Sequence, residues 1–425
     1  MATDPRAASI RRALAASLVG TSIEFYDFYV YATAASLVFG ELFFSAAPTG
    51  IRQIASFATL GVAFIARPLG SVFFGHFGDR VGRKSTLVAS LLTMGLSTLL
   101  VGLLPTYAQA GWWAPLILCI LRFGQGFGLG GEWGGAALLA VENAPPGWRA
   151  RFGAVPQLGA PVGFILANGL YLLLGIGLSA QQFHDWGWRI PFLLSAVLVG
   201  LGLWIRLRLA ETAEFAAALR HGPPPAVPVG AVVRHHGGAL LGGVFGTIAC
   251  FVLYYLATAF ALGYGTKTLG YPANRFLLVQ LGAICVMALT IWLSGWAADR
   301  HFDERRMLMA GCVMAILTGC LIQPLMGSGS LGLVFLFLSC CMFAMGFCYG
   351  PLGGWLPTLF PPLVRYTGVS AAFNLASILG GGLTPIAAQW LAITHGLVPV
   401  GLYCSGLAAI SLVALALMGP RAARD

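Results

Sequence analysis

The sequence GHFGDRVGRK, residues 75–84, closes a long apolar run and has a counterpart in the second half of the chain. The counterpart is GWAADRHFDERR, residues 295–306, which closes another apolar run. Asp299 of the second copy lies 220 residues after Asp79 of the first, about half of the 425-residue chain. We therefore predict two related halves.

The boundary between the halves is marked by a polar segment rich in proline. Residues 209–235 include Gly-Pro-Pro-Pro at 222–225, and this stretch is predicted to be a cytoplasmic linker. The N-terminal half then spans 1–208 and the C-terminal half 236–425. Repeats of this kind are typical of transporters, whose solute site lies between the repeats near the membrane midplane.

The composition is that of a membrane protein. Hydrophobic residues make up 58% of the chain and charged residues 9%, and the mean hydropathy is +0.84. A spanning helix needs about 20 apolar residues, and the ~10-residue alternating segments of a membrane barrel are absent. We predict an all-α membrane protein with twelve spanning helices, at about 14–40, 51–76, 85–105, 113–142, 153–177, 190–208, 237–263, 275–297, 307–326, 331–358, 368–394 and 398–418.

The distribution of Lys and Arg predicts the orientation. Eighteen of these 24 residues fall on the side of the N-terminus, two lie within spans, and four fall on the other side: Arg52, Arg189, Lys267 and Arg275. Since cytoplasmic loops carry the excess of basic residues, both termini are predicted to be cytoplasmic, in a bacterial inner or plasma membrane. The net charge of +10 is then explained by topology and anionic lipid, so no nucleic-acid partner is needed.

Several other classes of protein are disfavoured. The nine cysteines lie mainly in apolar spans without metal-ligand spacing, so we expect neither a metal nor a disulfide. Glycines at 124–131 follow no predicted strand, so they are expected to allow close helix packing and not to bind a nucleotide. No pairing of nucleophile and base points to an enzyme.

Two carboxylates in the first span are the main candidates for chemistry. Counted from Leu14, Glu24 lies about 15 Å and Asp27 about 20 Å along the helix, near the midplane and on one face. Two close carboxylates in a low-dielectric region do not both ionise easily, so one of them is expected to carry a proton. A purely structural pair is the alternative. Glu132, nearer the inner mouth, is the third candidate proton carrier.

Arg122 is the matching cation, about 13 Å into the fourth span. A buried guanidinium needs a carboxylate, so Asp27 or Glu24 is the expected partner in the empty state. Protonation of that acid would free Arg122 to bind a solute carboxylate, unless Arg122 merely joins two helices. Arg67 in the second span is expected to reach the headgroups or to pair with an acid.

Other polar groups in the spans are weaker candidates for contact with the solute, and each is as well suited to bridging helices. They are Gln125, Tyr31, Gln157, Asn168, Gln280 and Asn374. Aromatic residues such as Tyr254 and Tyr255 are candidates for cavity walls, or for anchors at the membrane interface.

Several stretches resemble the major facilitator superfamily. GHFGDRVGRK is similar to its loop 2–3 motif, and the fourth span, from Arg122, resembles its fourth-helix motif. Residues 20–39, 121–136 and 365–385 resemble the metabolite:proton symporter family, nearest to its shikimate-transporter-like branch. The resemblance implies a functional monomer that takes up a small organic acid with protons and no other cofactor. A betaine or proline symporter and a proton-driven exporter remain alternatives.

The resemblance also implies a charged gate at the cytoplasmic ends of the helices, which would lock one state and part in the other. Its basic members would otherwise only set the topology. The second copy of the loop motif departs from the pattern, with Asp303 and Glu304 before its arginines. The gating candidates are Asp79, Arg80, Arg83, Lys84, Glu142, Arg149, Arg151, Glu211, Asp299 and Arg300.

Overall fold

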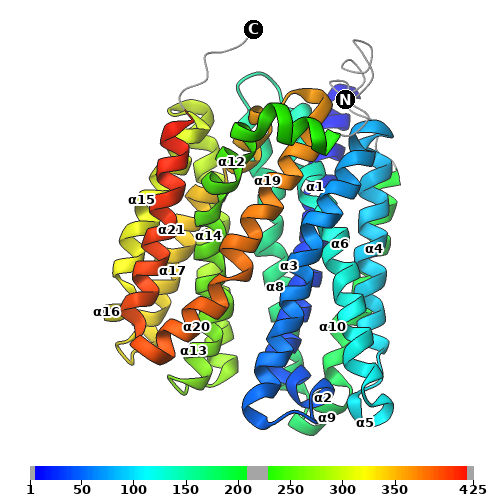
Figure 1. The fold of residues 1–425 in the computed structure, drawn as a ribbon, viewed down its shortest axis with the longest axis vertical. Helices are drawn as coiled ribbons and strands as arrows, with labels where there is room; N and C mark the ends of the chain where they lie inside the picture. Colours follow the sequence, from blue (N-terminus) through cyan, green and yellow to red (C-terminus); the bar gives the residue numbers. More distant parts are fainter. Residues whose placement is uncertain (1–4, 208–227, 419–425) are drawn as a thin grey trace.

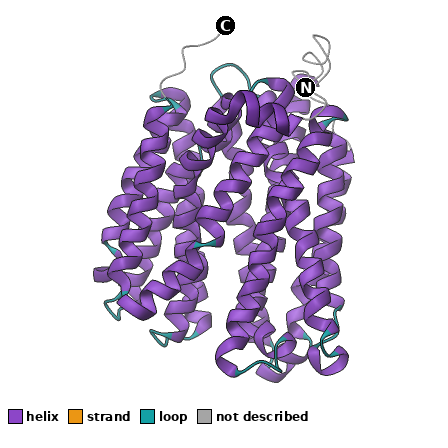
Figure 2. Ribbon diagram, in the orientation of Figure 1, coloured by secondary structure: helices purple, strands orange, loops and turns teal. Residues whose placement is uncertain are grey.

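The protein is a bundle of long helices that lie roughly along one common axis and alternate in direction (Figures 1 and 2). The computed structural model describes residues 5–207 and 228–418, and no strand occurs within these two ranges. The start of α1 and the end of α21 lie at the same end of the molecule, which we call the terminal face (Figure 1). The described residues confirm the predicted all-α fold.

Within residues 5–207, the N-terminal half contains six long helical runs and three short helices. The runs are α1–η1–α2 (Pro5–Ala34, Ala35–Phe39, Gly40–Phe43), α3 (Thr49–Arg80), α4 (Arg83–Leu103), α6 (Trp113–Glu142), α7–α8 (Arg149–Gln157, Gly159–Gly177) and α10 (Ile190–Leu207). The short helices, which the sequence pattern did not predict, are α5 (Tyr107–Ala110), α9 (Ala180–Asp185) and η2 (Gly187–Arg189).

The C-terminal half repeats the pattern of six runs. These are α12–η3–α13 (Pro228–Tyr255, Leu256–Phe260, Ala261–Lys267), α14 (Ala273–Arg300), α15–α16 (Glu304–Cys320, Ile322–Met326), α17–α18–η4 (Leu331–Tyr349, Leu352–Trp355, Leu356–Leu359), α19–η6–α20 (Arg365–Ser377, Ile378–Gly382, Thr384–His395) and α21 (Leu397–Leu417). A short η5 (Pro362–Val364) precedes α19.

The end of the predicted linker is helical. Helix α12 begins at Pro228, where proline is well tolerated in a first turn, and a non-helical backbone at His236 kinks it. Residues 228–235 therefore extend the first helix of the C-terminal half. The earlier part of the linker, with Glu211, lies outside the described residues.

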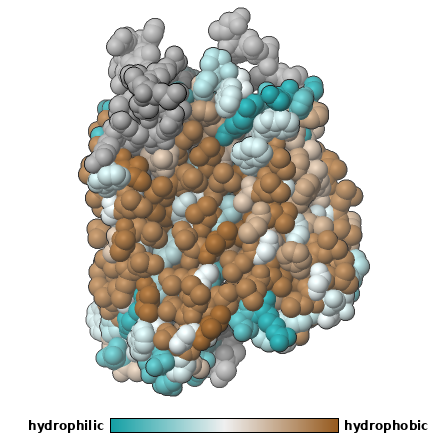
Figure 3. All heavy atoms as spheres, turned by 180° about the vertical axis from the view of Figure 1, so that it is seen from behind, coloured by the Kyte–Doolittle hydropathy of each residue, from teal (hydrophilic) through white to brown (hydrophobic). Residues whose placement is uncertain are grey.

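The bundle has the surface of a multi-pass membrane protein. In the described chain, ten helical segments are long and apolar enough to cross a membrane. The long runs that contain α1 and α15 complete the twelve of the fold. On the face shown in Figure 3, hydrophobic side chains cover the middle and hydrophilic ones gather toward the two ends.

Close contact between α3 and α6 sets the position of the centre of the N-terminal half. A Cβ on Gly126 would collide with the backbone of Ala63, and one on Gly130 with the carbonyl of Arg67. The glycines of α6 thus let the two backbones touch, as the packing interpretation of this glycine-rich segment predicts.

Candidate functional site

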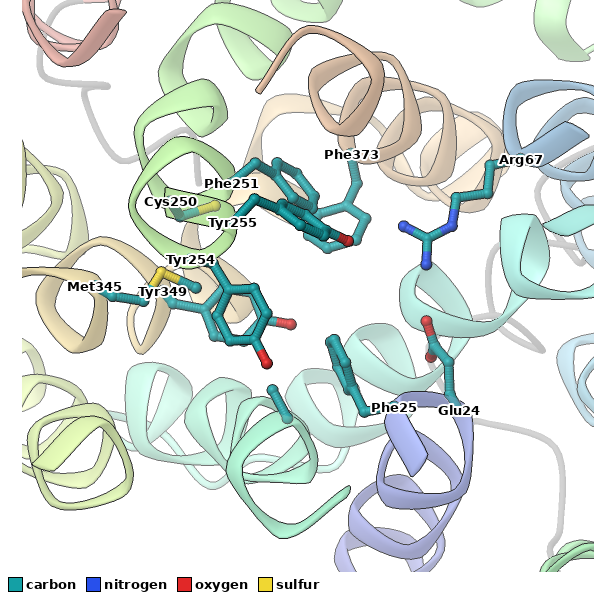
Figure 4. Close-up of a pocket in the computed structure, with 11 residues that line it drawn as sticks. Glu24, Phe25, Arg67, Cys250, Phe251, Tyr254, Tyr255, Met345, Tyr349 and Phe373 are labelled. Carbon is teal, nitrogen blue, oxygen red and sulfur yellow. The ribbon is translucent and has the colours of Figure 1, made fainter. Parts of the chain in front are cut away.

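A pocket lies between the two halves of the bundle (Figure 4). The N-terminal half contributes two charged side chains and the C-terminal half mostly aromatic ones. In this conformation the cavity that a water-sized sphere can enter is only about 20 Å³, room for about one water molecule, so a solute needs the pocket to widen. The lining residues are Glu24, Phe25, Arg67, Ala160, Cys250, Phe251, Tyr254, Tyr255, Met345, Tyr349 and Phe373.

Glu24 and Arg67 are the charged groups of the pocket, and their side chains point toward one another (Figure 4). Both are buried, and the Arg67 guanidinium lies 5.2 Å from the ring centroids of Phe28 and of Phe64. Of the two arrangements expected for Arg67, the one that faces an acid fits this geometry, and the one that reaches the headgroups does not. Helix α3 continues to Arg80, so Arg67 lies about 20 Å from that end of the helix, too deep for its side chain to span.

The aromatic wall carries polar atoms without partners. The hydroxyls of Tyr254 and Tyr349 and Nε of Arg67 are buried, and among the described residues none of them has a well-aligned hydrogen-bond partner. Buried polar atoms are nearly always paired in folded proteins. Three orphaned polar atoms around one pocket therefore point to a polar solute.

Asp27 lies outside the pocket, at one end of a chain of buried hydrogen bonds. The Thr98 hydroxyl donates to Oδ2 of Asp27 (2.9 Å), and Nε2 of Gln125 donates to that hydroxyl (2.7 Å). Nη1 of Arg122 in turn donates to Oε1 of Gln125 (3.0 Å). We call these four residues the relay.

The relay corrects the expected pairing of Arg122. Its guanidinium forms no ion pair with Asp27 or Glu24 in the described structure, because Thr98 and Gln125 lie between it and Asp27. Arg122 stacks instead on Tyr31, 4.0 Å from the ring centroid, and Tyr31 donates its hydroxyl to Thr59 (2.6 Å).

One ring connects the relay to the pocket. The centroid of Phe28 lies 5.1 Å from the Arg122 guanidinium and 5.2 Å from that of Arg67. A movement of either guanidinium would therefore displace the Phe28 ring. This ring also packs edge-on against the pocket residue Tyr255.

The remaining solute candidates lie outside the pocket lining and bond to protein groups. Gln157 accepts from Trp133 (2.9 Å) and donates to the Tyr349 carbonyl (3.1 Å), which joins the halves. Asn168 accepts from Thr33 (2.6 Å), and Gln280 donates to the carbonyls of Ala257 and Thr258 in η3 (2.9 and 2.8 Å).

Asn374 and Glu132 likewise have partners in the protein. Asn374 donates to the carbonyls of Gly130 (3.0 Å) and Ser370 (2.8 Å), and Glu132 accepts from Ser90 (2.7 Å). The contacts of Asn374 fit the helix-bridging interpretation that the sequence left open for it, while Glu132 bonds across from α6 to α4.

At the terminal face, an aspartate of each half accepts hydrogen bonds from the start of a helix of the other half. Asp79 at the end of α3 accepts from the N–H groups of Tyr366 and Thr367 (3.3 and 3.0 Å) and from the Thr367 hydroxyl (2.7 Å), at the start of α19. A carboxylate there satisfies free N–H groups and complements the positive end of the helix.

The second half returns the same contact. Asp299 at the end of α14 accepts from the N–H groups of Ala150 and Arg151 (2.8 and 3.0 Å), at the start of α7, and lies 3.0 Å from Nε of Arg151. The two aspartates that revealed the repeat in sequence are therefore equivalent in structure.

Two more contacts close this face. Glu142 lies 3.5 Å from Nη1 of Arg365, and Nε of Arg149 donates to the Gly354 carbonyl (3.3 Å). The sequence did not predict gate roles for Arg365, Tyr366 and Thr367. Tyr366 and Thr367 contribute backbone N–H groups, which almost every residue type has, so their contacts cannot be recognised from the sequence.

Three of the other gating candidates have contacts within their own half. Arg80 lies 3.3 Å from His76, Lys84 donates to the Leu207 carbonyl (2.8 Å), and Arg300 lies over Trp296 of its own helix. The side chain of Arg83 and all of Glu211 fall outside the described residues.

Comparison with known proteins identifies relatives along nearly the whole chain. The inner membrane metabolite transport protein YhjE of Escherichia coli K12 is 47% identical over 96% of this chain and 94% of its own length. The shikimate transporter of the same strain is 39% identical (90% and 87%), and its proline/betaine transporter 33% identical (90% and 78%).

Two further comparisons agree with the fold. The sugar (and other) transporter family model matches residues 13–221. The solved structure of the proton:xylose symporter XylE, bound to 6-bromo-6-deoxy-D-glucose, superposes with a TM-score of 0.76 at 17% identity, over 97% of this chain and 96% of XylE. The predicted resemblance and the prediction that the protein is not an enzyme are confirmed. Because relatives at 39 and 47% identity cover most of its length, the chain belongs to the major facilitator superfamily and, within it, to the metabolite transporters.

Proposed function

We propose that this protein is a proton-coupled symporter that imports a small organic acid by alternating access. The observation that carries the proposal is the pocket between the halves, where Arg67 faces Glu24 and two buried tyrosine hydroxyls have no well-aligned partner in the described part of the chain. A guanidinium binds a carboxylate through two parallel hydrogen bonds, which suits an organic acid. A relative that carries shikimate, a hydroxylated acid, supports this substrate class.

In this proposal, proton binding and solute binding are linked by competition for buried cations. Glu24 faces Arg67 in the empty pocket, and a solute carboxylate must take its place. Asp27, buried with its Oδ1 unpaired, binds the coupling proton and acts on Arg122 through the relay. A charged carboxylate with so few partners is costly in a membrane interior, which makes Asp27 suited to cycle between its two forms.

The excess of basic residues near the terminal face supports a cytoplasmic position for that face. With its gate closed by Asp79 and Asp299, the conformation is one in which solute cannot leave toward the cytoplasm. Since one chain supplies the whole pocket, a monomer in the inner membrane suffices, and the proton is the only coupling ion invoked.

A betaine-type osmolyte is the second candidate. The faces of Tyr254, Tyr255 and Phe251 suit a quaternary ammonium group through cation–π attraction. Arg67 would then hold the osmolyte carboxylate. The 33% identical proline/betaine transporter supports this candidate.

Uptake into proteoliposomes with an acidic exterior tests the proposal. Labelled shikimate, other mono- and dicarboxylates, betaine and proline are compared in the wild type, Asp27→Asn and the control Asp303→Asn, whose carboxylate caps its own helix α15. We expect an organic acid to accumulate in the wild type and control, and only to exchange in Asp27→Asn, because asparagine mimics the protonated acid.

Other outcomes separate the alternatives. Unchanged accumulation in Asp27→Asn would move the proton to Glu24 or Glu132. Accumulation of betaine alone would favour the osmolyte symporter, and uptake only when the lumen is acidic would indicate a proton-driven exporter.

A further inference from the structure

The Thr98 hydroxyl is a donor of the relay that has two acceptors within reach. Its Oγ1 lies 2.9 Å from Oδ2 of Asp27 and 3.0 Å from the carbonyl oxygen of Met94, one turn earlier in α4. A threonine hydroxyl carries one proton and can donate to only one of these acceptors at a time. Its oxygen meanwhile accepts from Nε2 of Gln125 at 2.7 Å.

We propose that Thr98 is a positioning residue whose hydroxyl switches between Asp27 and the Met94 carbonyl as Asp27 loses or gains a proton, and so changes how Gln125 holds Arg122. This inference rests on the proposed role of Asp27 as the proton site.

With Asp27 ionised, every bond of the relay points the same way. Arg122 donates to Gln125, Gln125 donates to Thr98, and Thr98 donates to the carboxylate. Hydrogen bonds arranged head to tail strengthen one another, so Gln125 holds Arg122 most firmly in this state.

When Asp27 gains a proton on Oδ2, its new O–H becomes a donor and faces the Thr98 oxygen. Thr98 then turns its own proton to Met94 and accepts from both Asp27 and Gln125. No covalent bond other than the new O–H changes. The reversed bond at Asp27 ends the head-to-tail order and loosens the hold of Gln125 on Arg122.

The consequence reaches the solute pocket through Arg122. Its Nε and Nη2 have no hydrogen-bond partner in the described structure, so Gln125 provides its one side-chain hydrogen bond. Phe28 touches both Arg122 and Arg67, and Arg67 lines the pocket. Thr98, Gln125 and Arg122 are almost fully buried, so water does not compete for the hydrogen bonds of the relay.

Three variants of α4 test the switch. Thr98→Val removes the hydroxyl at nearly constant volume, and Thr98→Ser keeps it. Thr93→Val is the matched control, because Thr93 is only half-buried on the same helix and its hydroxyl donates to the Ala89 carbonyl, away from the relay. The probe is labelled shikimate in proteoliposomes, followed both as exchange at equal pH and as accumulation driven by a pH gradient.

We expect Thr98→Val to retain exchange while its gradient-driven accumulation falls at least about fivefold, the lower range of a typical coupling free energy. The pH dependence of exchange should flatten in the same variant. Thr98→Ser and Thr93→Val should match the wild type. Accumulation that is unchanged in Thr98→Val would overturn the inference. If Thr98→Val does not fold, Gln125→Met breaks the next link and must give the same loss.

Infrared difference spectra without solute, recorded between acidic and neutral pH, provide an independent reading. A protonated-carboxyl band that disappears in Asp27→Asn belongs to Asp27, and it should change frequency in Thr98→Val but not in Thr93→Val. The same band, unmoved in Thr98→Val, would overturn the switch while leaving Asp27 as the proton site. If no band is lost in Asp27→Asn, the proposed proton site itself fails.

Discussion

At the scale of single residues, the pocket pairs one cation with one anion where both are shielded from water. A charge inside a membrane protein needs a counter-charge or a cavity. Arg67 has both, because Glu24 points toward it and the pocket lies beside it (Figure 4). A solute carboxylate can therefore replace Glu24 with little change in the total charge around Arg67.

The planar guanidinium of Arg67, with its paired N–H donors, leads to a specific prediction. Lysine keeps the charge but loses the planar pair of donors, so Arg67→Lys should raise the apparent KM for the transported acid about tenfold, equivalent to about 1.4 kcal/mol. Initial uptake rates over a concentration series measure it. Arg275→Lys, at an exposed arginine, is the control. An unchanged KM in Arg67→Lys would mean that Arg67 does not touch the solute.

At the scale of helices, the contact between α3 and α6 positions Arg67. Gly126 and Gly130 meet the backbone of α3 directly, and the carbonyl that Gly130 touches is that of Arg67 itself. The glycine-rich segment of α6 therefore places a cation of the neighbouring helix.

A single methyl group tests this contact. Gly130→Ala should separate α3 from α6 and destabilise the protein by about 1–3 kcal/mol, the usual cost of overpacking. Gly169→Ala in α8, where an added Cβ meets no atom within 4 Å, should instead be neutral or stabilising, because alanine favours helix. Thermal unfolding in detergent compares the two. Equal melting temperatures would contradict the packing argument.

At the scale of the whole molecule, two crossed contacts hold the halves together. Asp79 accepts hydrogen bonds from the start of α19, and Asp299 accepts them from the start of α7. Each half thus binds a helix of the other half at the terminal face. Hydrogen bonds to a charged group contribute about 1.5–3 kcal/mol each, and their loss should favour the state in which this face opens.

Hydrogen exchange measures the opening. In Asp299→Asn, the amides of Ala150 and Arg151 lose their charged acceptor and should exchange at least about tenfold faster, as expected for a loss of ~1.4 kcal/mol or more. Asp303→Asn, which removes a carboxylate that caps α15, should leave these amides unchanged. Equal exchange at 150–151 in both variants would show that Asp299 does not hold the gate closed.

Much of the candidate site was accessible from sequence, but its pairing was not. Burial of Glu24, Asp27 and Arg122 followed from their places in apolar spans. Their partners did not, because Thr98 belongs to the part of α4 after Lys84, which contains no charged residue that would draw attention to it. For Arg67, the end of α3 was placed too early, and its depth was underestimated as a result.

The sequence by itself determined the twelve helices, the repeat and the family, because these depend on local hydropathy and on motifs read along the chain. Only the tertiary structure decided that Arg67 lines the pocket, that Asp27 reaches Arg122 through Thr98 and Gln125, and that Asp79 and Asp299 bind helix starts of the opposite half. These contacts depend on how the helices rotate and cross, and several use backbone N–H groups common to almost every residue.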